Sequence, residues 1–408
     1  MAKACERESR ERESCKGQKH GGYASDLDIF CEVIDNYGDI GVVLRLAKEF
    51  RRRGGPDIRI RVVVNDLNAL AAIHPGIRDV EAQELGGIAF FRDREFREAG
   101  RGIARTAIGA FGCDPPEAYL AEGREKGMLL LDLQYLTGEK WAEDFHLKPS
   151  MVPGKLRKFF YFPGFTPESG GLLQRPQFRE RVRLAPEKFV NKYFGEFSGP
   201  QKRLKIVVFS YERDFSGLLE ALRKLDKPAA LLVCGGKSRA AFGKFIGEFQ
   251  KKDFGNIHIC GKIEMKYAEF FTQDQFEELL NAADVNFVRG EDSAAQAATA
   301  GKPFLWELYP QRDNVQLDKL EGFLRTYGKF FPGGAESQAA RETSELFRAY
   351  NSGDGALRDA PAERYLAFFK NLRTIGEACG AFSAELARSC DLLTKIKTII
   401  QEYAGGKL

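Results

Sequence analysis

The stretch DVNFVRGEDSAAQAATAGKPFLWELYPQ, residues 284–311, decides the fold of this chain. It begins with a short apolar run, breaks at Gly290, continues through small residues typical of a helix, and ends in a second apolar run. Gly301 and Pro303 separate the helix from the second run, because glycine ends helices and proline does not continue them. The pattern predicts a strand, a helix and a strand in chain order, over 284–288, about 292–300 and 304–308. This β–α–β unit is typical of an open α/β sheet.

Three polar residues, Glu291, Asp292 and Ser293, stand where the predicted strand ends and the helix begins. Open α/β sheets bind their ligands at this edge. The free N–H groups and positive dipole of a helix N-terminus favour a phosphate there. Two adjacent carboxylates would repel a bare phosphate, whereas a nucleotide-sugar offers sugar hydroxyls beside its pyrophosphate. The alternative is that Asp292 or Ser293 only caps the helix.

Length and composition limit the possible functions. The 408 residues suit two α/β domains, and 43% apolar residues suffice for two cores. No stretch approaches the ~18 uncharged apolar residues of a membrane span, so we expect no membrane partner. The net charge of +4 indicates no nucleic-acid partner and at most favours an acidic protein. Eight cysteines without a CxxC pair, and no signal segment, predict a reduced cytoplasmic protein, and the scattered histidines form no zinc pattern.

The first ordered unit follows a charged, glycine-rich start. Residues 1–26 are expected to be a disordered extension. An apolar run from 27, a loop over 35–41, a helical pattern and an alternating run over 58–64 predict a βαβ unit. It lacks GxGxxG, so a dinucleotide is not indicated. Its loop places Asp35 and Asp39 at the carboxyl end of a strand; the alternative is an Asx-turn with a helix cap.

Similar units continue through both halves of the chain. In the first half they are AFGCDPPEAYL, GMLLLDLQYLTGEKW and KFFYFPGFTPESGGLL. The last segment, which is aromatic, is expected to be a strand that leaves the domain; the alternative is an aromatic platform that binds nucleic acid. In the second half, GGKS at 235–238 is no P-loop, because Leu231 stands where the Walker pattern needs glycine. Two Rossmann-like α/β domains facing a central cleft, with a helical C-terminal tail, form the GT-B arrangement of glycosyltransferases. We place an acceptor-binding domain at 27–180 and a nucleotide-sugar-binding domain at 181–375. A tail at 376–408 is expected to pack back across both domains.

Six motifs in this order resemble one family: VIDNYGDIGVVLRLA, FGCDPPEAYL, FFYFPGFTPESGGLL, FSYE, VNFVRGEDS and AGKPFLWELYPQ. Over about 27–320 the chain is similar to the protein-arginine rhamnosyltransferases that modify bacterial translation elongation factor P. The resemblance implies a GT-B fold and transfer of L-rhamnose from dTDP-β-L-rhamnose to an arginine of elongation factor P. It also implies inversion of the anomeric centre, without a metal or cofactor.

The same resemblance implies roles for individual residues. The two loop aspartates of the family match Asp35 and Asp39, the second being its general-base candidate, and the glutamate of its RGEDS motif matches Glu291. We hypothesise that Asp39 is the base, Asp35 a second guanidinium anchor or loop organiser, and Glu291 an orienter of the sugar or the acceptor. Arginine needs such carboxylates because its guanidinium is always protonated and its lone pairs are delocalised. The implied substrate-binding residues are Asn36, Tyr37, Gly38, Phe209, Tyr211, Phe271, Gln273, Arg289, Gly290, Asp292, Ser293 and Tyr309. The aromatic residues are expected to stack on thymine, Gln273 to bond its edge, and the helix near Asp292 to hold the pyrophosphate.

Several positions depart from the family pattern. Gly109 stands where the family has glutamate, Gln296 where it has arginine, and Thr299 where it has tryptophan. Gln316 stands in place of a histidine, and Phe276–Glu277 in place of Tyr-Asp. Loss of the cation at 296 is expected to weaken diphosphate binding, whereas the three acids are kept. The alternatives are a GT-B transferase with another nucleotide-sugar or acceptor, and a non-catalytic protein that binds elongation factor P or a nucleotide-sugar.

Overall fold

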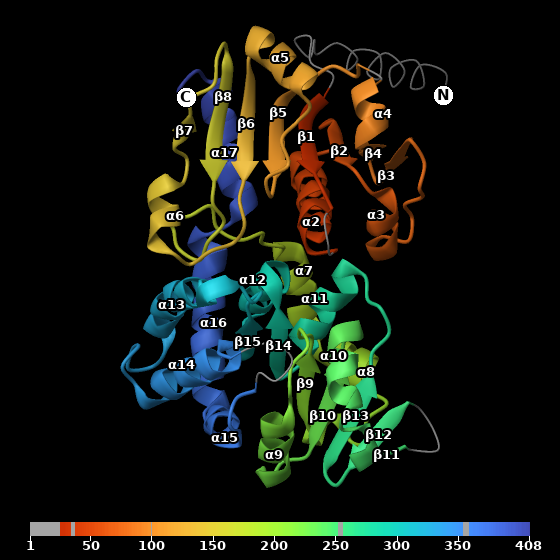
Figure 1. Cartoon of the computed structure of the whole chain (residues 1–408), viewed down its shortest axis with the longest axis vertical. Coiled ribbons are helices and arrows are strands. Elements are labelled where there is room, and N and C mark those ends of the chain that lie inside the picture. Colours follow the sequence, from red (N-terminus) through yellow and green to blue (C-terminus); the bar gives the residue numbers. More distant parts are fainter. Residues whose placement is uncertain (1–24, 34–36, 99, 252–255, 354–358) are drawn as a thin grey trace, which may run out of the picture.

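The computed structural model describes residues 25–33, 37–98, 100–251, 256–353 and 359–408. These residues form two α/β domains, drawn one above the other in Figure 1. Each domain contains a sheet whose central strands are parallel, with helices packed against it. The two Rossmann-like halves predicted from the sequence are therefore present.

The first sheet has eight strands among the described residues, in the order β3-β4-β2-β1-β5-β6-β8-β7. The strands are β1 (Ser25–Cys31), β2 (Ile60–Val64), β3 (Ala82–Leu85), β4 (Ile88–Arg92), β5 (Ala104–Ala110), β6 (Met128–Leu133), β7 (Pro149–Ser150) and β8 (Leu156–Tyr161). The helices are α2 (Tyr37–Gly54), α3 (Leu67–Ile73), α4 (Asp93–Glu98), α5 (Glu117–Lys126) and α6 (Lys140–Phe145). At the two edges of the sheet, β3 pairs antiparallel with β4 and β7 pairs antiparallel with β8. Because side chains alternate along a strand, Ile29 joins the core under α2 and Phe30 joins the core on the opposite face.

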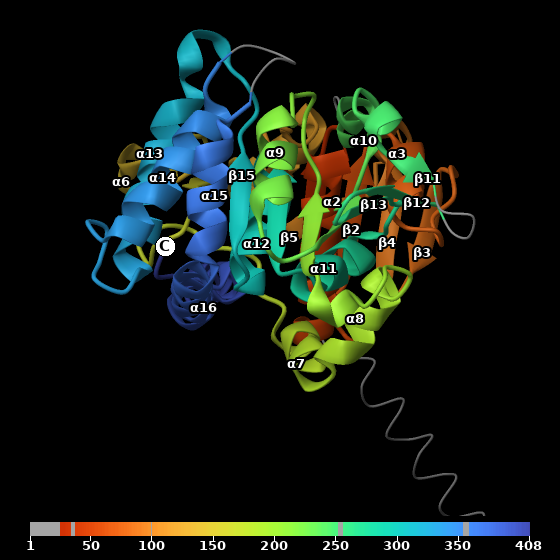
Figure 2. The same cartoon turned by 90° about the horizontal axis from the view of Figure 1, so that it is seen from below.

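The second sheet has seven strands among the described residues, in the order β11-β12-β13-β10-β9-β14-β15. The strands are β9 (Leu204–Val208), β10 (Ala229–Val233), β11 (Gln250–Lys251), β12 (Ile257–Cys260), β13 (Ile263–Tyr267), β14 (Val285–Arg289) and β15 (Phe304–Glu307). The first helices of this half are α7 (Pro176–Leu184), α8 (Pro186–Phe194), α9 (Ser216–Lys224), α10 (Gly236–Gly243), α11 (Gln273–Ala282) and α12 (Gly290–Ala300). The remaining ones are α13 (Gln316–Tyr327), α14 (Gln338–Asn351), α15 (Ala362–Lys370), α16 (Leu372–Ser389) and α17 (Leu392–Ala404), with 3₁₀ turns at Pro200–Lys202, Ile246–Glu248, Arg312–Asn314 and Gly328–Phe330. Helices α13 to α16 lie together on the β15 side of the sheet, away from β11 and β12 (Figure 2).

Residues 284–311 form the predicted strand, helix and strand. Strand β14, helix α12 and strand β15 follow one another as expected, and the helix begins at Gly290, slightly earlier than predicted. Gly290 has φ +69, a left-handed conformation that glycine adopts without steric cost and that turns the strand directly into the helix. Gly301, with φ +68, ends the helix as the sequence indicates.

Three predicted boundaries need correction. Ser25 and Asp26, assigned to a disordered extension, lie in β1, where Ser25 pairs with Ala104 of β5 and donates a hydrogen bond to Asp28. The extension's other residues, 1–24, lie outside the described residues. The predicted boundary after residue 180 falls inside α7, whose Phe178 and Val182 already pack in the second core. Residues 37–41, predicted as part of a loop over 35–41, lie in α2, which begins at Tyr37.

The C-terminal helices contribute to both cores. Helix α16 packs in the second domain through Ile375, Cys379 and Phe382. Helix α17 returns to the first sheet and fills its core with Leu393 and Ile396, as Figure 1 shows behind β6 and β8.

Candidate active site

The carboxyl ends of the parallel strands in both sheets point toward the boundary between the domains (Figure 1). Helix α2 follows β1 and helix α12 follows β14, and these two helices contact each other across the boundary. In open α/β sheets, ligands bind outside the carboxyl ends of the strands. The functional site is therefore expected at this boundary.

Asp39 lies in the first turn of α2, on the first domain. The hydroxyl of Tyr135, from the loop after β6, donates a hydrogen bond to Oδ2 of Asp39 at 3.0 Å. Burial raises the pKa of the Asp39 carboxyl, the Tyr135 hydrogen bond opposes that shift, and the charge of Glu291 adds to it. A carboxylate whose pKa is raised is a stronger base than a solvated one, which suits proton abstraction.

Glu291 lies in the first turn of α12, on the second domain. Nζ of Lys319, from α13, donates to Oε1 of Glu291 at 2.9 Å, and this ion pair is largely buried. The charge of Glu291 acts on both Asp39 and Tyr135. Two predicted catalytic carboxylates, on helices of opposite domains that contact each other, are thus electrostatically coupled. Asp35 and Asn36 lie outside the described residues.

Asp292, the next residue, faces the first domain. It forms an ion pair with Arg45 of α2, and its Oδ2 accepts a hydrogen bond from Gln296 at 2.9 Å. Gln296 also donates to Gln273, the first residue of α11, at 3.3 Å. A Cβ added at Gly41 of α2 would lie 2.6 Å from Nε2 of Gln273, so the glycine permits this close approach between the domains.

Aromatic residues and a cation form a second group beside α12. The guanidinium of Arg289 lies 4.4 Å from the ring centroid of Phe209 and 4.9 Å from that of Tyr211, and it donates to the Ser210 carbonyl at 2.7 Å. The rings of Tyr211 and Tyr309 pack edge to face at 5.5 Å, and Tyr309 is half exposed. A cation flanked by aromatic rings at the mouth of a helix can bind a phosphate and an adjacent base or sugar.

The side chains of Phe271 and Ser293, both predicted to bind substrate, have partners within the protein. Phe271 packs edge to face against Tyr193 of α8, with ring centroids 5.7 Å apart, and belongs to the second core's periphery. Its neighbour Phe270, which the sequence analysis passed over, is 62% exposed and contacts Tyr37 across the domain boundary at 5.9 Å. Two adjacent phenylalanines in a loop give no periodicity that separates the buried ring from the exposed one. The hydroxyl of Ser293 donates to the Arg289 carbonyl, so a phosphate there would be bound by backbone N–H groups.

A sequence model described as "Elongation-Factor P (EF-P) rhamnosyltransferase EarP" matches residues 27–401. This chain belongs to the EarP family. A protein-arginine rhamnosyltransferase of Pseudomonas putida is 37% identical over 333 residues, which cover 79% of this chain and 86% of the relative. One of Pseudomonas aeruginosa is 36% identical over 343 residues, which cover 80% and 87%.

A solved structure agrees with this assignment. It is described as "Structural basis for EarP-mediated arginine glycosylation of translation elongation factor EF-P" and matches 93% of this chain and 99% of its own, with 25% identity and a TM-score of 0.59. The family assignment and the GT-B fold predicted from the sequence are confirmed. The chain is a glycosyltransferase of the protein-arginine rhamnosyltransferase type.

Three of the positions expected to depart from the family pattern have polar partners inside this chain. Glu277 forms an ion pair with Arg175 at 2.6 Å, and Thr299 donates to the Gln296 carbonyl at 2.9 Å. Gln316 accepts from the backbone N–H of Gln311 at 3.1 Å. A Cβ at Gly109 would lie 2.5 Å from the Cys113 carbonyl oxygen, so a larger side chain requires another path for the following loop.

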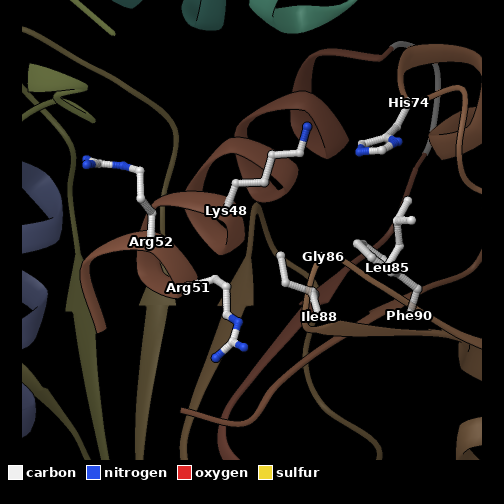
Figure 3. A pocket seen from close by; sticks show the side chains of 8 residues that line it. All are labelled: Lys48, Arg51, Arg52, His74, Leu85, Gly86, Ile88 and Phe90. Carbon is white, nitrogen blue, oxygen red and sulfur yellow. The ribbon is translucent and has the colours of Figure 1, made fainter. Parts of the chain in front are cut away.

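A hollow of about 250 Å³ lies away from these residues, on the first domain (Figure 3). It is lined by the basic face of α2, the end of α3 and the β3–β4 hairpin: Lys48, Arg51, Arg52, His74, Leu85, Gly86, Ile88 and Phe90. None of the predicted site residues lines it. Within the described ranges, no cluster of three or more His, Cys, Asp or Glu side chains is arranged to hold a metal ion, and no helix is long and apolar enough to span a membrane.

Proposed function

We propose that this chain transfers L-rhamnose from dTDP-β-L-rhamnose to an arginine of translation elongation factor P, with inversion of the anomeric centre. One observation supports the proposal most strongly: the charge of Glu291, on the second domain, acts both on Asp39 of the first domain and on Tyr211, whose ring lies beside the Arg289 guanidinium. A guanidinium acceptor needs carboxylates, and an activated sugar needs a phosphate site. The relatives' name and the solved EarP structure support the same acceptor and sugar.

The first domain supplies the base in this proposal. Asp39 accepts an N–H of the guanidinium and takes its proton as the nitrogen forms a bond to the anomeric carbon. The bond from that carbon to the dTDP oxygen breaks, and its electron pair leaves with the diphosphate. Burial of Asp39 raises its pKa and strengthens it as a base. General-base help of this kind contributes about 10²–10⁴-fold in rate.

The second domain supplies the donor site. The first turn of α12 offers free backbone N–H groups to the pyrophosphate, and the Arg289 guanidinium offers a cation nearby. Tyr211 and Tyr309 provide ring faces for the thymine, and Phe270 and Tyr37 form a further aromatic pair at the same boundary. Glu291, held by Lys319, orients the sugar or the guanidinium. The proposal needs no metal or cofactor, and no nucleic-acid or membrane partner.

The arrangement of the two domains supports inversion. The base lies on α2 of the first domain, and the site for the leaving diphosphate lies on α12 of the second. A nitrogen activated from one side attacks the sugar opposite a leaving group held on the other side. This single displacement turns a β-linked donor into an α-linked product.

The test is the anomeric configuration of the product. Elongation factor P modified by this protein with dTDP-β-L-rhamnose is digested, and the glycosylated arginine peptide is analysed by NMR spectroscopy. The proposal predicts an α-L-rhamnosyl linkage on arginine. A β linkage would contradict inversion, and transfer only from another nucleotide-sugar would support a different GT-B transferase.

A further inference from the structure

Tyr135 lies in the segment after β6, to which the sequence analysis assigned no role. It follows Leu133, the last residue of β6, by two positions, at the sheet edge where β1 and β5 also end. Its hydroxyl donates to Oδ2 of Asp39 at 3.0 Å, although the two residues are 96 positions apart. Tyr135 is thus a direct partner of the proposed base.

Phe111 fixes the ring of Tyr135. The two rings stack with centroids 4.9 Å apart and an interplanar angle of 27°. Phe111 follows β5 directly and has φ +58, a left-handed conformation that costs energy for a non-glycine residue. Its N–H donates to the Leu133 carbonyl at 2.8 Å, which ties the ends of β5 and β6 together. Left-handed non-glycine residues concentrate at functional sites, and here one stacks on Tyr135, the hydrogen-bond partner of Asp39.

The rest of the Tyr135 ring is open. Phe111 covers one face, yet 42% of the residue is exposed. Its hydroxyl contacts Asp39, and the charge of Glu291 also acts on the phenol. Burial and these charges raise the pKa of Tyr135, so its hydroxyl stays protonated and remains a donor to Asp39. A cation binds favourably over the face of a tyrosine ring, and a guanidinium also pairs with carboxylates in its own plane.

We propose that Tyr135 orients Asp39 through its hydroxyl and offers its open ring face to the acceptor guanidinium. This inference rests on the proposed function and deepens it by naming a residue that recognises the arginine. Tyr135 is a positioning residue for the base and an acceptor-binding residue, and it takes no proton itself. With one Asp39 oxygen held by Tyr135, the other is left to accept from the attacking nitrogen.

Two substitutions separate the hydroxyl from the ring. Tyr135→Phe keeps the ring and is expected to lower kcat on the order of tenfold, with little change in the KM for elongation factor P. It also moves the acidic limb of the kcat/KM profile to higher pH, because the Tyr135 hydrogen bond holds the pKa of Asp39 down and its loss raises that pKa. Tyr135→Leu removes the ring too and is expected to raise the KM for elongation factor P by roughly 2- to 5-fold.

Tyr119→Phe is the matched control. Tyr119 also donates its hydroxyl to a carboxylate of the first domain, Oδ2 of Asp28 at 2.6 Å, but this pair is buried under α5 and Asp28 keeps its ion pair with Arg61. Its loss is expected to leave kcat, KM and the pH profile as in the wild type. Melting temperatures and calorimetric binding of dTDP-β-L-rhamnose show that each variant is folded and binds donor.

The outcomes separate this inference from the proposed function. If the wild type transfers rhamnose and Tyr135→Phe matches it in kcat and pH profile, the inference is wrong and the proposed function stands. The inference also fails if Tyr119→Phe shifts the pH profile as much as Tyr135→Phe does. If the wild type itself transfers no rhamnose to elongation factor P, both fail.

Discussion

Arg45 of α2 forms an ion pair with Asp292 of α12, joining the two domains through residues 247 positions apart. The side chain of Arg45 is 5% exposed and that of Asp292 is 12% exposed. Burial lowers the pKa of Arg45 to about 10, so the guanidinium remains charged at neutral pH. Gln296, where a cation was expected from the family pattern, donates to the same Asp292 carboxylate at 2.9 Å.

The first prediction concerns the stability of this pair. Arg45→Met or Asp292→Asn alone leaves a buried charge without its partner, which costs about 3–5 kcal/mol. The double variant removes both charges and is expected to lose less than the sum of the single variants. Urea denaturation of the four proteins measures this coupling. Arg373→Met, at a pair whose arginine is 93% exposed, is the control and is expected to change little. Additive losses in the double variant would show that the pair has no coupling.

The second prediction concerns the close approach at Gly41. Gly41→Ala places a methyl group 2.6 Å from Nε2 of Gln273, so the Gln273 side chain must move away from Gln296 and Asp292. We expect weaker binding of dTDP-β-L-rhamnose by calorimetry, although alanine favours helix α2 by up to ~1 kcal/mol. Gly380→Ala in α16 has no atom within 4 Å of the new methyl group and should leave donor affinity unchanged. Equal affinities for both variants would contradict a role for Gln273 in the donor site.

The third prediction concerns pH dependence. The charge of Glu291 raises the pKa of Asp39, and Lys319 partly neutralises that charge. Glu291→Gln removes the charge, so the pKa of Asp39 falls and the acidic limb of kcat/KM moves to lower pH. Lys319→Met leaves Glu291 uncompensated, so the same limb moves to higher pH. The pH profiles of both variants measure these shifts, and shifts in the same direction would contradict the electrostatic coupling.

The fourth prediction concerns the C-terminal helix α17. Ile396 is 1% exposed and packs in the core of the first domain. Ile396→Ala is expected to destabilise the protein by about 2–5 kcal/mol, because it leaves a cavity. Thr398→Ala on the exposed side of the same helix is the control. Equal melting temperatures for the two variants would show that α17 contributes no core packing.

Local sequence signals were sufficient to predict the strands and the helix of the second domain that carry the site. The apolar runs around Gly290 and Gly301 predicted β14, α12 and β15 almost to the residue, because strand and helix periodicities are local. The start of α2 was predicted too late. Gly38 and Gly41 lower helix propensity and therefore indicated a loop, whereas Gly41 lies in the helix to let Gln273 approach.

Contacts between distant parts of the chain could not be predicted in this way. The ion pair of Arg45 has no local sequence signal, since its partner Asp292 is in the other domain. Tyr135 showed no motif of its own, and its role depends on the loops after β1, β5 and β6 ending at one edge. Glu291 and Asp39 were found from their positions where strands end and helices begin, and the resemblance to the family pointed to their catalytic use; their electrostatic coupling across the domain boundary came from the structure.

The most direct test of the central proposal is the intact mass of elongation factor P from the same organism, incubated with this protein and dTDP-β-L-rhamnose. Wild-type protein is expected to add one deoxyhexosyl unit. Asp39→Asn, which keeps the shape of the side chain but removes its basicity, is expected to slow the addition by about 10²–10⁴-fold. An unchanged mass with wild-type protein that still binds the donor would contradict the proposed acceptor, and equal rates for Asp39→Asn would contradict the role of Asp39 as the base.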